Sequence, residues 1–224
     1  MQLYDAMEWD RLGATLGSVS VFMALYRGET LYDYLMLRRR LRDEEIDATA
    51  VLLEDVRKWR ESSMTYADRA EVLKRTADLL EFTGGLWEEE AEIYRDLIAL
   101  AIGAGDRWRE ATAHQGLGRT HRLSHRYGEA LDAYANAYQI GEELGDQRTI
   151  SASIDGRARV HMNRGELDRA LELLLQVLAI CEKLADREGV ARALSIIGWV
   201  HKEQGRPPEA LACHEKGLVI HRSF

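Results

Sequence analysis

The sequence predicts an all-α protein, built as a stack of antiparallel helical hairpins, from its composition and from a repeat of about 40 residues. Of the 224 residues, 46% are apolar and 30% are charged, which suits a globular chain with a substantial core. Only two prolines and three phenylalanines occur, whereas the good helix formers Ala, Leu, Glu and Arg are abundant. Because strand-forming residues do not cluster between turn signals, helices are expected throughout.

Two kinds of break divide the repeat. The unit boundaries join a turn residue to an aspartate: Gly105-Asp106-Arg107, Gly145-Asp146-Gln147 and Ala185-Asp186-Arg187. Glycine tolerates the left-handed turn that ends a helix, and the aspartate can cap the free amides of the next one. A second break lies inside each unit: Ser124-His125-Arg126, Asn163-Arg164-Gly165 and Gln204-Gly205-Arg206. Each unit therefore contains two helices of roughly fifteen residues.

Small residues recur at fixed places in these helices. The second helix opens with Glu129-Ala130-Leu131, Arg169-Ala170-Leu171 and Glu209-Ala210-Leu211, and closes on Ile140, Ile180 and Ile220. The first helix carries Leu117-Gly118, Arg157-Ala158 and Ile197-Gly198, followed three residues later by His121, His161 and His201. Small residues let neighbouring backbones approach, and apolar residues at helical spacing fill the space behind them.

This arrangement resembles the tetratricopeptide repeat. The matching positions of the three units are Gly118, His121, Ala130 and Tyr134; Ala158, His161, Ala170 and Leu174; and Gly198, His201, Ala210 and His214. The resemblance implies a right-handed α-solenoid, a TPR-like superhelix that binds a protein or peptide in its concave groove. The units are longer than the family's usual 34 residues, as in the extended repeats of bacterial sensor and regulator proteins.

The repeat array is expected to span residues 66–224. Its units are predicted at 66–105, 106–145, 146–185 and 186–224. The first unit is degenerate, with Trp87, Ala91 and Tyr94 in its second helix. Residues 1–65 are expected to be helical, as an N-terminal cap or a degenerate hairpin.

The net charge, the cysteines and the hydropathy limit which classes of protein this chain can belong to. A formal net charge of -8 gives no general attraction for a phosphate backbone. Cys181 and Cys213 are predicted to be reduced core thiols, since no closely spaced cysteines accompany them. The start has no basic leader before an apolar run, and no apolar stretch reaches the roughly 20 residues of a membrane span. A cytoplasmic protein is therefore expected.

Catalytic and metal signatures are absent from the sequence, and we expect neither an enzyme nor a cofactor. His121, His161 and His201 are one repeat apart, too far to share a zinc ion, so they are predicted to be structural. His121 and His125 have the chelating i, i+4 spacing, but no third ligand is evident. Acids from Glu88 to Glu92 begin a helix, where the backbone dipole favours them. The arginines from Arg38 to Arg42 suit a solvated helix junction or an acidic partner.

The first helices are expected to line the groove of an interaction scaffold or peptide-binding sensor module. A helical wheel selects Gln115, Arg119, Arg122, Asp155, Arg159, Asn163, Arg192, Ser195, Trp199 and Lys202. Five cations against one acid favour an acidic peptide or a free C-terminal carboxylate. Alternatively, these arginines pair with acids of neighbouring units.

Other functions stay open. One alternative is that the chain is a regulatory segment of a larger nucleotide-dependent switch or of another enzyme. Another is that it binds nucleic acid through its arginines. The last helix is as apolar as the internal ones, with Leu211, Leu218, Val219 and Ile220. Repeat arrays normally end in a unit with a polar outer face. We therefore expect self-association through this helix, or a longer parent chain.

Overall fold

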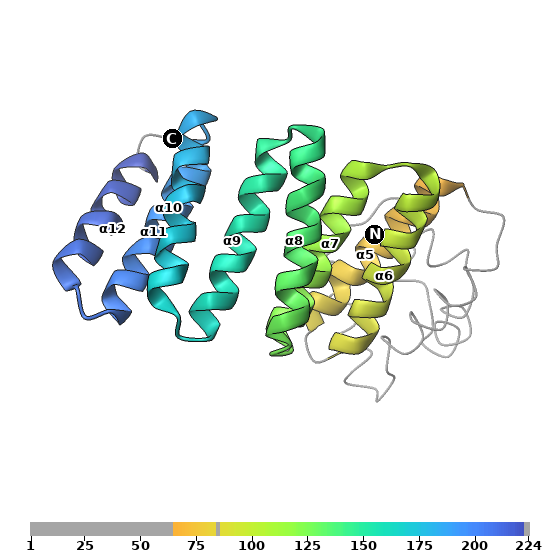
Figure 1. The fold of residues 1–224 in the computed structure, drawn as a ribbon, viewed down its shortest axis with the longest axis horizontal. Helices are drawn as coiled ribbons and strands as arrows, with labels where there is room; N and C mark the ends of the chain where they lie inside the picture. The colour runs from red at the N-terminus through yellow and green to blue at the C-terminus, as the bar shows by residue number, and fades with distance from the viewer. Residues whose placement is uncertain (1–64, 84–85, 222–224) are drawn as a thin grey trace, which may run out of the picture. The chain divides into compact units, whose positions relative to one another are not determined.

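The computed structural model describes residues 65–83 and 86–221, and every regular element in these two ranges is an α-helix (Figure 1). The chain separates into two compact units, residues 1–76 and 77–224, and the array considered below lies in the second unit. The expectations for residues 1–64, including the arginine run, lie outside the described residues.

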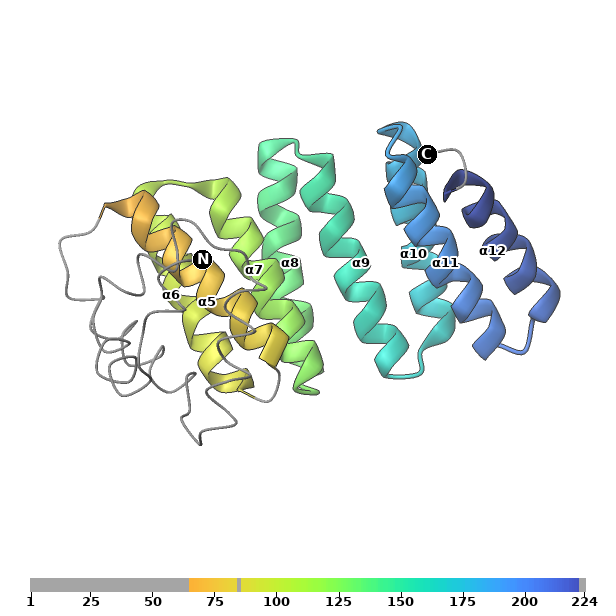
Figure 2. The same ribbon diagram turned by 180° about the vertical axis from the view of Figure 1, so that it is seen from behind.

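Eight helices follow one another along the described ranges: α5 (Tyr66–Thr83), α6 (Trp87–Ala104), α7 (Arg107–Leu123), α8 (Tyr127–Leu144), α9 (Gln147–Asn163), α10 (Leu167–Lys183), α11 (Arg187–Glu203) and α12 (Pro207–His221). From α6 onward each helix packs against the next one in the sequence. Figures 1 and 2 show this succession from opposite sides. The predicted helical hairpins and their order are confirmed.

The helix ends lie where the sequence predicted them. Gly105 and Gly145 end their helices with φ of 69° and 66°. The carboxylates of Asp106, Asp146 and Asp186 then accept hydrogen bonds from backbone N–H groups in the first turn of α7, α9 and α11. These caps satisfy amides that the helix itself leaves free.

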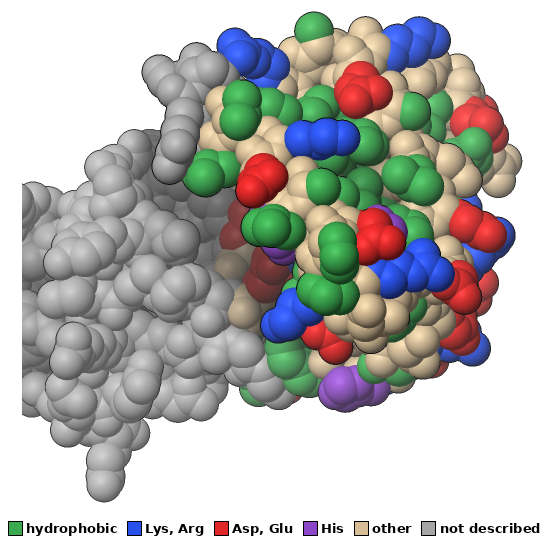
Figure 3. All heavy atoms as spheres, turned by 90° about the vertical axis from the view of Figure 1, so that its left-hand side faces the viewer, with side chains coloured by type: hydrophobic (Ala, Val, Ile, Leu, Met, Phe, Trp, Pro, Cys, Tyr) green, Lys and Arg blue, Asp and Glu red, His purple; other side chains and the backbone are tan. Residues whose placement is uncertain are grey.

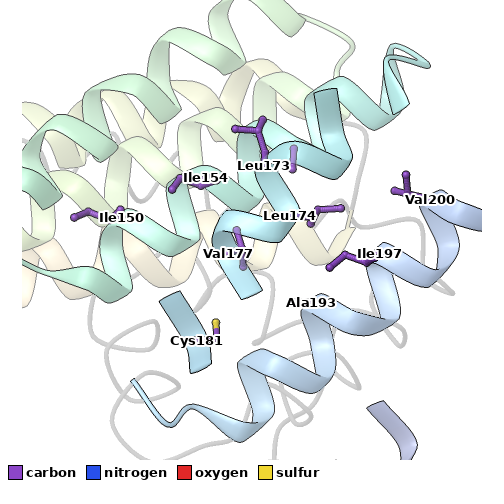
Figure 4. Close-up of a cluster of buried hydrophobic side chains, with 10 residues drawn as sticks. Ile150, Ile154, Leu173, Leu174, Val177, Cys181, Ala193, Ile197 and Val200 are labelled. Atoms are coloured by element: carbon purple, nitrogen blue, oxygen red, sulfur yellow. The ribbon is translucent and has the colours of Figure 1, made fainter. Parts of the chain in front are cut away.

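The core between units is aliphatic in the C-terminal half of the array. One buried cluster joins α9, α10 and α11 (Figure 4): Ile150, Ile154, Ala158, Leu173, Leu174, Val177, Cys181, Ala193, Ile197 and Val200. The repeated alanines Ala130, Ala170 and Ala210 are all buried, as close helix packing requires.

Both cysteines are free, Cys181 buried and Cys213 half-buried. Among the described helices, none has the length and apolar character needed to cross a bilayer.

Candidate functional site

The ten residues predicted to line the groove lie on the first helices α7, α9 and α11, and we call them the first-helix surface. They are Gln115, Arg119, Arg122, Asp155, Arg159, Asn163, Arg192, Ser195, Trp199 and Lys202. Those on α7, together with Asp155 and Arg159 on α9, are half-buried. Asn163 and the four members on α11 are exposed. The surface therefore becomes more open toward the C-terminal end of the array.

Two tyrosines of the second helices determine how closely each second helix and the first helix of the next unit pack. A Cβ atom at Gly116 would lie 2.1 Å from the Tyr94 ring, and one at Gly156 would lie 2.2 Å from the Tyr134 ring. Each ring therefore occupies space that only a glycine of the next unit leaves free. Helix α7 packs directly against α9 in this region.

The hydroxyl groups of these tyrosines meet the arginines of α7. Arg119 donates from Nη2 to the Tyr94 hydroxyl over 3.2 Å. Arg122 makes a side-chain hydrogen bond with the Tyr134 hydroxyl, and burial raises the pKa of Tyr134 above its ordinary value. Both hydroxyls thus stay protonated at neutral pH and contribute no charge to the surface.

Several members of the first-helix surface already have partners within the chain. Arg119 forms a salt bridge of 2.5 Å with Glu81 of α5, and Arg159 forms one of 2.7 Å with Asp155, one turn before it. Gln115 donates from Nε2 to the Thr149 carbonyl and the Ser153 hydroxyl, at 3.1 and 3.2 Å. Of the three arginines in this half, Arg119 thus pairs with an acid of another unit, Arg159 with an acid of its own helix, and Arg122 bonds a tyrosine hydroxyl.

The α11 part of the surface is different. Trp199 is 40% exposed, and the exposed cations Arg192 and Lys202 lie on the same helix before and after it. Within residues 65–83 and 86–221, neither cation has an acidic partner. An open aromatic ring between two unpaired cations is a combination enriched at protein interfaces.

A buried acid lies close to this surface, and the sequence reasoning did not identify it. Glu90 is in the first turn of α6, as expected, but its side chain is fully buried rather than solvated. Thr120 Oγ1 donates to its Oε1 over 2.9 Å, while Oε2 has no hydrogen-bond partner. Burial, helped by the charges of Glu81 and Asp78, raises the pKa of Glu90 to about 7, although Thr120 and Arg119 oppose this shift.

The histidines predicted to be structural lie in the last turn of the first helices α7, α9 and α11. His121 is buried, and burial lowers its pKa. His161 Nδ1 is 2.6 Å from a carboxylate oxygen of Glu166 in the turn that follows α9. His125 takes the left-handed conformation with φ of 62°, where other units have glycine. No group of His, Cys, Asp or Glu in the described part of the chain could hold a metal ion.

Comparison with known families matches residues 148–223 to the tetratricopeptide repeat. This stretch covers the units of α9 to α12, the most regular part of the array. Among curated proteins, no sequence matches this chain.

Solved structures share the architecture. BtubC (BKLC) from P. vanneervenii is 18% identical, with 84% of this chain and 76% of that chain covered and a TM-score of 0.64. Aspartyl phosphate phosphatase F from Bacillus subtilis is 13% identical over 79% of this chain and 46% of its own, with a TM-score of 0.69. A third structure is a signal transduction ATPase with numerous domains (STAND) and a tetratricopeptide repeat sensor, from Pyrococcus horikoshii. It is 14% identical, with 76% of this chain and 27% of that chain covered and a TM-score of 0.58. At these identities the likeness concerns the fold alone.

Proposed function

We propose that this chain, a tetratricopeptide repeat protein, is an interaction module that binds a protein segment or peptide along its first-helix surface. Repeats of helical hairpins present one helix of every unit on a continuous face, which suits an extended ligand. The observation that carries the proposal is the α11 part of the surface, where exposed Trp199 lies between two cations that have no acidic partner among the described residues.

The ligand that fits this surface is an acidic segment or a free C-terminal carboxylate. Arg192 offers a planar fork to both carboxylate oxygens, and Lys202 supplies a second positive charge about ten residues along the same helix. Trp199 provides an apolar anchor between them. On α7 and α9, a ligand carboxylate competes with Glu81 and Asp155 for the arginines, so α11 supplies the main anchor and α7 and α9 supply weaker contacts.

Selection of binders from a library of random peptides displayed with free C-termini tests this proposal. The full chain is the bait, and the enriched peptides are synthesised and titrated by calorimetry. We expect enrichment of acidic or carboxylate-terminated peptides. Replacing Arg192 and Lys202 by Ala removes two charge-assisted contacts, each of about 1.5–3 kcal/mol, so affinity falls at least about tenfold for each.

Matched variants locate the site. Lys183→Ala removes an exposed cation from the second helix α10 and leaves affinity unchanged. Arg119→Ala with Arg159→Ala weakens binding only if the ligand reaches α7 and α9, and unchanged affinity would restrict the site to α11. If Arg192→Ala/Lys202→Ala also binds as tightly as wild type, the first-helix surface is not the site. If no peptide is enriched, peptide binding itself is rejected.

A second candidate is a regulatory segment of a larger nucleotide-dependent protein. The supporting observation is the likeness to the STAND protein, whose tetratricopeptide repeat sensor belongs to a signal transduction ATPase and which is several times longer than the matched segment. A genomic reading frame that joins this chain to a phosphate-binding domain would support it. The absence of catalysis and a cytoplasmic location both stay predictions.

A further inference from the structure

The last helix of the array, α12, exposes apolar side chains at positions that are covered elsewhere. Leu211 and Leu218 are 60% and 48% exposed, and His214 between them is exposed as well. We call these three residues the terminal face. They lie three and four residues apart, so they share one side of the helix. Figure 3 looks onto this end of the array, where apolar side chains lie among charged ones.

The repeat shows what normally covers such a face. One unit earlier, the same positions of α10 hold Leu171, Leu174 and Leu178. Leu174 is buried in the cluster that includes Ala193 and Ile197 of α11, and the other two leucines pack against that cluster. On α8 the corresponding Tyr134 is buried with Val160 of α9. In each case the cover is the first helix of the following unit.

We propose that the terminal face of α12 binds an amphipathic helix of another protein, in the place that α9 takes on α8 and α11 takes on α10. This surface is separate from the first-helix surface, so the proposal goes beyond the function proposed above. The interface continues one that the chain already makes at three junctions, where a second helix packs against the first helix of the next unit.

The internal interfaces specify the chemistry of the partner helix. The residue facing position 214 is small, because glycines accept the Tyr94 and Tyr134 rings at the equivalent places. An aliphatic residue follows it four positions later, as Val160 of α9 does where it packs with Tyr134. Glu215 is four residues after Leu211 and three before Leu218, so it lies at the edge of the terminal face and favours a cation on the partner.

A second copy of this chain is a poorer occupant. Three of the described first helices, α7, α9 and α11, each pack between two second helices, so none of these three is free to cover another chain. The fourth, α5, holds a buried Thr76 where α7 and α9 hold Gly116 and Gly156, so this position does not offer a small residue to His214 of another copy. Antiparallel pairing of two α12 helices about a two-fold axis brings Glu215 near Glu215 of the other copy, a like-charge contact.

The probe is a capped synthetic peptide with the α9 sequence, residues 147–163. It combines Gly156 with aliphatic residues, and its Arg157 interacts electrostatically with Tyr138, the α8 counterpart of Leu218, where it partly opposes the rise in the tyrosine pKa that the hydrogen bond with Glu142 causes. The peptide is titrated into the labelled full chain and backbone amide shifts are followed by NMR. We expect saturable shifts in α12 with a dissociation constant on the order of 10⁻⁴ M, since an isolated short helix must fold on binding.

Two variants of the chain and one of the peptide decide the outcome. Leu211→Glu with Leu218→Glu weakens binding at least about tenfold, because it places charges in an apolar contact. Leu175→Glu, at an exposed apolar position on α10 and not on α12, leaves binding unchanged. The Gly156→Val peptide binds more weakly because its side chain meets His214.

Three results would overturn the proposal. The first is an absence of saturable shifts in α12, the result expected if a further helix of a longer parent chain covers the terminal face. The second is equal binding to the double variant. The third is sedimentation of the wild-type chain as a dimer that the double variant converts to a monomer, which would make a second copy the occupant. Because none of these variants alters the first-helix surface, failure here leaves the peptide-selection result unaffected.

Discussion

Replacing Glu90 by Gln should abolish a large part of the dependence of folding stability on pH. The carboxyl pKa is raised from 4.5 to about 7 in the folded chain, chiefly by burial. Between these pH values the folded state holds a proton that the unfolded state releases, so the free energy of unfolding falls as pH rises. The pKa difference of 2.5 (7 minus 4.5) corresponds to about 3 kcal/mol at most.

The Glu90→Gln variant cannot ionise at this position, so its free energy of unfolding does not fall with pH for this reason. Glu90→Gln should match the wild type near pH 4.5 and exceed it by up to about 3 kcal/mol at pH 8. His114 and His121 have lowered pKa values and contribute with the opposite sign, because their stabilisation is lost as pH falls. Both histidines are present in the two proteins, so the difference between the two curves isolates Glu90.

Urea unfolding followed by circular dichroism from pH 4.5 to 8.5 measures this difference. Glu92→Gln, an exposed acid half a turn away, is the matched control and should run parallel to the wild type. Glu90→Ala with Thr120→Val recreates the buried pair Ala130 and Val160 of the next unit, and it should be at least as stable as wild type at pH 8. Parallel curves for Glu90→Gln and wild type over the whole range would refute the reasoning.

Four further variants test the packing and the helix ends by the same unfolding measurement. Gly156→Val should destabilise the chain by about 1–3 kcal/mol because it meets the Tyr134 ring, whereas Gly103→Ala, with no neighbour within 4 Å, should stabilise it by about 0.5–1 kcal/mol. Ala185→Gly should stabilise by about 0.5–1 kcal/mol by relieving a left-handed φ of 53°, and an unchanged midpoint would argue against strain there. Asp146→Ala should cost about 1 kcal/mol at neutral pH and less in acid, since its hydrogen bond from Thr149 lowers the pKa of Asp146 and that stabilisation is lost as pH falls through it.

Helix boundaries could be predicted from the sequence because they depend on local chemistry. Asp106, Asp146 and Asp186 cap the helices they were predicted to cap, since capping needs only a short carboxylate next to free amides. The left-handed turns at Gly105 and Gly145 follow from the same local logic. Such signals involve residues close in sequence, so a single chain displays them.

The partners of the charged side chains could not be predicted in the same way. A helical wheel places Arg119 on a face, but its bond to Glu81 depends on two flexible side chains on different helices, one of them in a degenerate unit. Glu90 was overlooked for a different reason. From the sequence, Ala91 is predicted to be the small residue of the second helix in the first unit. Tyr94 and Tyr134 are 40 residues apart, however, and with this spacing Glu90 is the residue that corresponds to Ala130.

With this 40-residue alignment, the contacts between successive units change from polar to apolar along the chain. The buried pair is Glu90 and Thr120 at the first junction, Ala130 and Val160 at the second, and Ala170 and Val200 at the third. Polar groups in a protein interior favour one arrangement over others only when they are hydrogen-bonded, and here one oxygen of Glu90 is not. The first junction is therefore the one at which protonation changes the local balance of charge around Arg119.

The same gradient bears on binding. The α7 and α9 parts of the first-helix surface are held together by Gln115, which bonds Thr149 and Ser153, and two of their three arginines, Arg119 and Arg159, are paired with acids. At α11 the side chains are exposed, and within the described part of the chain its two cations have no acidic partner and no helix covers the terminal face of the adjoining α12. A ligand gains most where the chain has not already satisfied its own polar groups and covered its own apolar side chains. Both proposed interactions therefore concentrate on the unit of α11 and α12, and substitutions there should alter binding more than equivalent substitutions in α7.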